Sequence, residues 1–144
     1  MQELLDNRIL MASFSAWFVA QLLKFLGTLL LCGRIDLTRL VGAGGMPSAH
    51  SALVTALAVA TGRTTGFSSP LFAVAVVLAG IVMYDATGVR QAVGNQAEVL
   101  NRIVDDLYHD GSIREERLRE LLGHTQVEVL VGCVLGIAFA LVLT

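Results

Sequence analysis

The sequence predicts an all-α integral membrane bundle of about four hydrophobic helices, the second of them short, with amphipathic helices at the membrane surface. Hydrophobic residues make up 55% of the 144 residues and charged residues only 15%, whereas roughly 25% of a soluble domain is charged. Long stretches contain no charge: between Arg8 and Lys24, between Arg39 and Arg63, between Arg63 and Asp85, and after Glu128. Each approaches the roughly 20 apolar residues that cross a bilayer core. Residues 1–144 therefore read as a single membrane-embedded domain.

The first two hydrophobic segments differ in length. The first covers residues 9–31 and contains Lys24. The second covers residues 47–61, with Pro47 expected in the first helical turn, where a missing N–H costs nothing. A helix of that length rises ~22 Å, less than the ~30 Å bilayer core. We therefore expect the second helix to be a partial span buried among the others.

The remaining helices follow from their caps and apolar patterns. Ser69 and Pro70 begin a third hydrophobic helix that ends near residue 87. A polar region follows, with an amphipathic helix over residues 91–108 and a charged helix that opens at a capping box, residues 112–115. The last hydrophobic helix, residues 125–143, carries Gly132-x-x-x-Gly136. This spacing favours close helix packing and could also join two copies of the chain.

The polar groups of this apolar chain are expected at one membrane face. If the four segments cross in turn, residues 32–46 and 89–126 lie on the same side. Lys24, His50, Arg90 and His124 then come together from four separate parts of the sequence. An ionisable group inside a membrane span indicates function by default.

Each of these residues also has a simpler interpretation. Lys24 could extend its ammonium group to the interface, and Ser48 could only cap the second helix. His50 could be a hydrogen-bonded core histidine, and Arg90 an ordinary charge beside the membrane. Asp85, in the last turn of the third helix, needs a partner because an unpaired buried carboxylate is costly. Lys24, Arg90 or His50 would each serve.

Glu128 has two competing interpretations. Thr125-x-x-Glu128 is a capping box, which directs the carboxylate to the backbone of the first helical turn. His124 and Glu128 are also four residues apart, close enough for the carboxylate to orient the imidazole ring if the helix begins early. The sequence leaves both open.

Four ordered motifs resemble the type 2 phosphatidic acid phosphatase superfamily, which is related to acid phosphatases and vanadium haloperoxidases, and above all its small divergent membrane branch. They are GGMPSAHSA (44–52), YDATGVR (84–90), QAEVLN (96–101) and LGHTQVEVLVG (122–132). The resemblance implies that His124 is a nucleophile, that Glu128 orients it and that His50 is the general acid. It implies a phosphate site made of Lys24, Arg90, Ser48 and the Gly44 and Gly45 backbone.

The sequence departs from the superfamily pattern at several positions. Glu128 stands where aspartate is usual, and Ala49 stands where glycine is usual. Arg34 follows Lys24 without the usual proline. Arg119 lies nearer the usual place of the phosphate-binding arginine, but Arg90 belongs to the motif of the divergent branch and is preferred. Asp85, Arg34 and Arg119 are kept as supporting residues.

The resemblance implies a lipid phosphate phosphatase that works through a phosphohistidine, without metal or cofactor. Phosphatidylglycerophosphate is the first expected substrate, followed by phosphatidate and prenyl phosphates or diphosphates. The expected partners are membrane lipids, and no basic run favours nucleic acid. The acidic residues and histidine at 105, 106, 109 and 110 are expected to be solvated rather than metal-bound. The rival hypothesis is a non-catalytic protein that binds phosphate-bearing lipids or serves as a structural partner subunit.

Arginine placement indicates the orientation. The expected active face carries seven arginines against Arg8 and Arg63 on the other: Arg34, Arg39, Arg90, Arg102, Arg114, Arg117 and Arg119. The positive-inside rule favours a cytoplasmic site in a multi-pass membrane protein. The two cysteines, Cys32 and Cys133, lie in apolar stretches and are expected to be free thiols.

Overall fold

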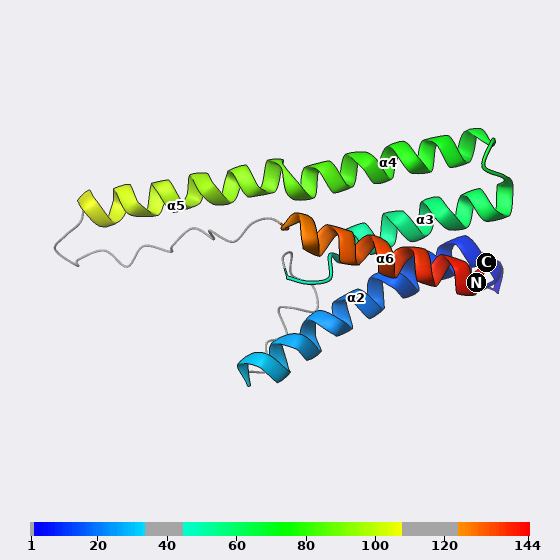
Figure 1. Cartoon of the computed structure of the whole chain (residues 1–144), viewed down its shortest axis with the longest axis horizontal. Helices are drawn as coiled ribbons and strands as arrows, with labels where there is room; N and C mark the ends of the chain where they lie inside the picture. The colour runs from blue at the N-terminus through cyan, green and yellow to red at the C-terminus, as the bar shows by residue number, and fades with distance from the viewer. Residues whose placement is uncertain (1, 34–44, 108–123) are drawn as a thin grey trace.

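The structure is a computed structural model that describes residues 2–33, 45–107 and 124–144. Within these residues the secondary structure is helical, without strands. The helices are α1 (Gln2–Asp6), α2 (Arg8–Cys32), α3 (Ala49–Thr65), α4 (Pro70–Thr87), α5 (Val89–Leu107) and α6 (Gln126–Leu143). In Figure 1, α2, α3, α4 and α6 form a bundle, and α5 continues from α4 away from it. The predicted all-α bundle is confirmed.

The short helix α3 is the centre of the bundle. It has 17 residues and packs against α2, α4 and α6. Its buried side chains are small, mainly alanine and serine: Ala49, Ser51, Ala52, Val54, Ala56, Ala58, Ala60 and Thr61. Small side chains on the central helix let three neighbours approach it at once, and this explains how a helix too short to span a bilayer alone is buried among longer ones.

Helices α3 and α6 approach each other closely at two glycines. A Cβ atom on Gly136 would lie 2.5 Å from the Ala52 carbonyl oxygen, and one on Gly132 would lie closer still to the Ser48 carbonyl oxygen. Real Cβ atoms do not approach a backbone atom so closely. At Gly132 and Gly136, α6 thus packs directly against the backbone of α3.

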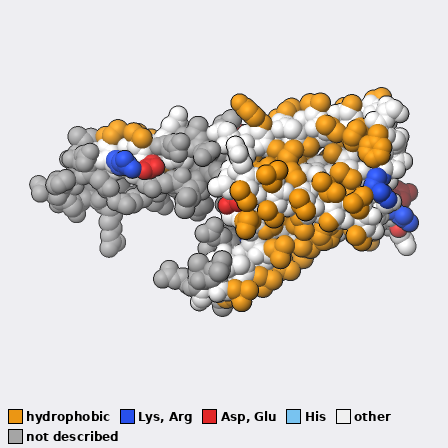
Figure 2. Space-filling model, in the orientation of Figure 1, with side chains coloured by type: hydrophobic (Ala, Val, Ile, Leu, Met, Phe, Trp, Pro, Cys, Tyr) orange, Lys and Arg blue, Asp and Glu red, His pale blue; other side chains and the backbone are white. Residues whose placement is uncertain are grey.

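Three helices of the described residues are long and apolar enough to cross a membrane: Arg8–Leu30, Pro70–Thr87 and Gln126–Leu143. Their outward side chains are largely apolar. Figure 2 shows hydrophobic side chains over the visible face of the bundle, with charged side chains at the end that holds the chain termini and a few toward the other end. Such a surface fits contact with hydrocarbon along the helices and with water at their ends.

The helix caps explain most of the boundaries. Ser69 caps α4, whose first residue is Pro70, and Thr125 caps α6, as predicted. Pro47, in contrast, lies before the helix and not in its first turn, because the Ser48 hydroxyl accepts the Ser51 N–H and makes Ser48 the N-cap of α3. The expected amphipathic helix begins at Val89, directly after Gly88, and not at residue 91. The expected charged helix from residue 112 lies outside the described residues.

The two ends of the bundle hold different segments of the chain. The two termini and the turn between α3 and α4 lie at one end of the bundle (Figure 1). The C-terminus of α2, the N-termini of α3 and α6, and the junction of α4 with α5 lie at the other. All candidate functional residues that the structure describes belong to this second end, which we call the site end.

Candidate active site

Three helices carry candidate residues to the site end. They share a layer formed by alanines of α2, α3 and α6: Ala12, Ala60 and Ala140. Lys24, Ser48 and Glu128 are each 12 residues from the alanine of their own helix, all in the direction of the site end. At 1.5 Å per residue, each lies ~18 Å along its own helix from this layer. All three residues therefore lie at the site end, with α2 inclined to α6 (Figure 1).

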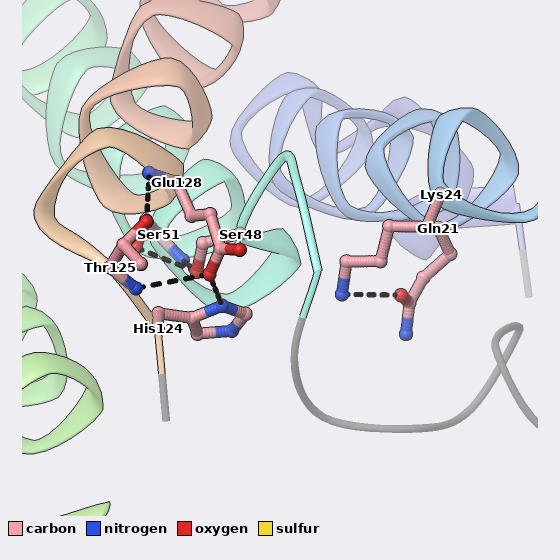
Figure 3. Close-up of polar contacts among 7 residues, drawn as sticks. All are labelled: Gln21, Lys24, Ser48, Ser51, His124, Thr125 and Glu128. Carbon is pink, nitrogen blue, oxygen red and sulfur yellow. Dashed lines mark hydrogen bonds and ion pairs between the residues drawn. The ribbon is translucent and has the colours of Figure 1, made fainter. Parts of the chain in front are cut away.

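His124 is fixed by its backbone and by its ring. Its N–H donates to the Ala86 carbonyl oxygen in the last turn of α4 (3.0 Å), which is one of the carbonyls a helix end leaves without an internal partner. Its ring Nδ1 lies 2.9 Å from Glu128 Oε2 (Figure 3). The residue is only 3% exposed. The imidazole is thus held at the junction of α4 and α6.

Glu128 makes both of the contacts that the sequence left open. Oε2 accepts the Thr125 N–H at 3.1 Å, and the Glu128 N–H donates to Thr125 Oγ1 at 3.3 Å, which completes the capping box. The same Oε2 atom contacts His124 Nδ1. A carboxylate oxygen has two lone pairs and can accept both bonds. The cap therefore aims the carboxylate at the imidazole ring.

The second ring nitrogen of His124 is buried and has no hydrogen-bond partner among the described residues. The carboxylate can only accept, so Nδ1 of the neutral ring carries the proton and Nε2 carries a lone pair. Buried polar atoms are normally satisfied, and an exception calls for an explanation. The lone pair of Nε2 is therefore left for a partner that the described residues do not supply.

Ser48 links α3 to α6 through its backbone. Its N–H donates to the Glu128 carbonyl oxygen (3.0 Å). Its hydroxyl oxygen accepts from Ser51 Oγ at 2.9 Å and from the Ser51 N–H at 3.4 Å, and both serines are fully buried. Because a hydroxyl can accept two bonds and donate one, the Ser48 O–H is left able to donate. Ser48 is thus a helix cap that also retains a donor.

Lys24 points into the protein. It is 4% exposed, and its Nζ donates to Gln21 Oε1 at 3.0 Å, with Gln21 also 4% exposed (Figure 3). A lysine that only reached for the interface would leave its ammonium group in water. The buried contact favours the interpretation of Lys24 as a site residue.

The other candidates lie on α3, α4 and α5 and in the segment before α3. His50 lies in the first turn of α3 and Asp85 in the last turn of α4, both half-buried at the site end. Gly45 has a φ of 83°, a left-handed conformation that suits glycine. Arg90 belongs to the first turn of α5. Gly44, Arg34 and Arg119 lie outside the described residues.

Three site residues were missed by sequence reasoning. Gln21 precedes Lys24 by three residues, so it lies on the same helix face, and a polar residue inside an apolar span was the available signal. Ser51 relates to Ser48 in the same way. The Ala86 carbonyl had no signal, because its role depends on where α4 ends beside His124.

Among the described residues, no group of acidic, histidine or cysteine side chains could hold a metal ion. Side chains 105, 106, 109 and 110 lie outside that description. Cys133 is a free thiol that donates to Met83 Sδ (3.2 Å).

Fold and site together define an integral membrane helical protein with a histidine–carboxylate pair at one end of its bundle. The profile of the divergent PAP2 family matches residues 5–139. The chain is also 39% identical to the "uncharacterized membrane protein YuiD" of Bacillus subtilis (strain 168) over 98% of this chain and 96% of the relative. No solved structure matches. The chain belongs to the divergent PAP2 family.

Proposed function

We propose that the protein is a lipid phosphate phosphatase that forms a phosphohistidine on His124. The observation that carries the proposal is the state of the His124 ring: Glu128 holds Nδ1 at 2.9 Å, and Nε2 is buried without a partner among the described residues. A neutral imidazole with one nitrogen fixed by a carboxylate and the other unoccupied is what a histidine nucleophile needs.

In the first step, Nε2 attacks phosphorus and the bond from phosphorus to the ester oxygen breaks. Protonated His50 gives its proton to the departing oxygen, so the lipid leaves as an alcohol. Glu128 stabilises the positive charge that develops on the imidazole. Lys24, Arg90, the Ser48 hydroxyl and the backbone N–H groups of Gly44 and Gly45 bind the phosphoryl oxygens.

In the second step, neutral His50 takes a proton from water, and the water oxygen attacks phosphorus. The bond from phosphorus to Nε2 breaks, inorganic phosphate leaves, and both histidines return to their starting states. The reaction requires positioned cations and hydrogen-bond donors around phosphorus, and neither step changes an oxidation state.

The position of the site supports a lipid as the substrate. Lys24, Ser48 and Glu128 lie at the site end of a bundle whose outer surface is apolar. A phosphate headgroup can enter at this end while acyl or prenyl chains stay among the helices. The distribution of arginines along the sequence favours the cytoplasmic side, where phosphatidylglycerophosphate is our first candidate, followed by phosphatidate and prenyl phosphates or diphosphates.

The test is phosphate release from a panel of these lipids by the purified protein in detergent with EDTA present. We expect wild-type protein to release phosphate from at least one lipid and His124→Ala to lose that activity. Ser68→Ala, in the exposed turn at the opposite end, is the matched control and should retain it.

Full activity in His124→Ala would overturn the phosphohistidine mechanism. Absence of release from every lipid in the panel would instead favour the non-catalytic alternative, in which the protein binds phosphate-bearing lipids or supports a partner. In that case the histidine–glutamate pair serves to cap α6.

A further inference from the structure

Lys24 is held by a residue that the proposed mechanism does not use. Its Nζ donates to Gln21 Oε1 at 3.0 Å, and both side chains are 4% exposed. The two residues are three apart on α2, so they lie on one face of the helix. This face is turned into the bundle, because a residue directed at the surrounding solvent or lipid would be exposed.

Holding the ammonium group matters because lysine is flexible. Its charge sits at the end of a four-carbon chain with three donors and no fixed plane, unlike the rigid guanidinium of arginine. A point charge of this kind contributes more to binding a phosphate when its position is set in advance, because less freedom is lost on binding. The contact with Gln21 supplies one fixed direction for Nζ.

The chemistry of the amide fixes its own orientation as well. An ammonium group only donates, so the amide must present its oxygen to Lys24 and turn its NH2 group elsewhere. Figure 3 shows this arrangement, with the Lys24 ammonium and Gln21 at the level of the chain that leads into Ser48. A glutamate at the same position would also accept the bond, but it would add a negative charge beside the phosphate.

We infer that Gln21 is a positioning residue, which holds the Lys24 ammonium at the site end so that it meets the phosphate of the substrate. The inference rests on the proposed function. It adds to that function because it assigns two residues of α2, Gln21 and Lys24, to the binding of an anionic headgroup.

The test is a double-mutant cycle on lipid phosphate hydrolysis. Gln21→Leu removes the acceptor at similar size, and Lys24→Met removes the ammonium at similar length. We expect each single variant to lower kcat/KM by about tenfold or more, the scale of a hydrogen bond to a charged group. In the Lys24→Met background, Gln21→Leu should have little further effect, because Gln21 acts through Lys24.

Two further variants separate positioning from folding. Ser13→Ala is the matched control: Ser13 is a buried polar residue of the same helix that bonds the Ile9 carbonyl oxygen at 2.7 Å, ~16 Å along α2 from Lys24. Its effect should be independent of Lys24. Gln21→Glu keeps an acceptor for Nζ, so it should fold like wild type, and its added charge should raise KM and the Ki of inorganic phosphate.

The outcomes distinguish the two claims. If wild-type protein hydrolyses a lipid phosphate but Gln21→Leu matches it while Lys24→Met is impaired, the inference is wrong and the proposed function stands. The inference is also wrong if the effects of Gln21→Leu and Lys24→Met are additive. If wild-type protein hydrolyses nothing, the proposed function has failed first.

Discussion

At the scale of the residue, one carboxylate oxygen of Glu128 joins helix formation to the candidate chemistry. Oε2 accepts the Thr125 N–H and contacts His124 Nδ1, so the bond that starts α6 also aims the imidazole. This pair could be predicted from the sequence because all its members lie within five consecutive residues. The sequence alone left capping and orienting as alternatives, because the spacing of the residues does not show where α6 begins. In the structure one oxygen makes both contacts.

Glu128→Gln should separate charge from capping. The amide oxygen can still accept the Thr125 N–H, so the melting temperature in detergent should stay near that of wild type. The charge that stabilises the developing imidazolium is lost, so kcat should fall on the order of 10²–10⁴-fold, as for an orienting carboxylate in other histidine mechanisms.

Thr125→Ala should have the reverse effect. It removes the N-cap hydroxyl, which costs about 1 kcal/mol of stability, but keeps the carboxylate. The expected result is a lower melting temperature with kcat within a few-fold of wild type. If Glu128→Gln only lowered the melting temperature and left kcat unchanged, the carboxylate would be a cap and nothing more.

At the scale of the element, two glycines of α6 determine how closely α6 packs against α3 beside the site. Gly132 and Gly136 bring α6 against the backbone of α3, which allows the Ser48 N–H to reach the Glu128 carbonyl oxygen (3.0 Å). The spacing of the two glycines predicted close packing. It could not identify α3 as the partner, because nothing within α6 depends on which helix fills its face.

Gly132→Ala and Gly136→Ala should therefore each lower stability by about 1–3 kcal/mol, the scale of overpacking. The Cβ atoms would meet backbone that cannot move aside, and Gly132→Ala should also lower activity because it displaces Ser48. Gly80→Ala on α4 is the matched control, since a Cβ there meets no atom within 4 Å. Thermal unfolding in detergent gives the comparison, and equal behaviour of all three variants would contradict the packing.

At the scale of the whole molecule, the alternating direction of the helices gathers the site at one end. The sequence allowed the order of the crossings to be predicted from its uncharged segments, and it placed Lys24, His50 and His124 at one face together with Arg90. It could not show that Lys24 turns inward to Gln21, or that His124 bonds the end of α4, because both depend on packing between segments distant in the chain.

This arrangement predicts opposite labelling of two loops. In a background with Cys32 and Cys133 replaced by serine, single cysteines at positions 68 and 111 are tested with a membrane-impermeant thiol reagent on intact cells. Position 68 should label from outside, and position 111 only after the membrane is opened, as the arginine distribution favours. Labelling of both positions from the same side would contradict the opposed ends of the bundle.

The central claim is that His124 Nε2 takes the phosphoryl group, and rapid quenching with a ³²P-labelled lipid phosphate tests it most directly. We predict a phosphorylated protein that forms during turnover, is stable in base and labile in acid, maps to His124 and is absent from His124→Ala. Steady hydrolysis by wild-type protein with no labelled enzyme at any quench time, together with undiminished turnover in His124→Ala, would contradict the claim.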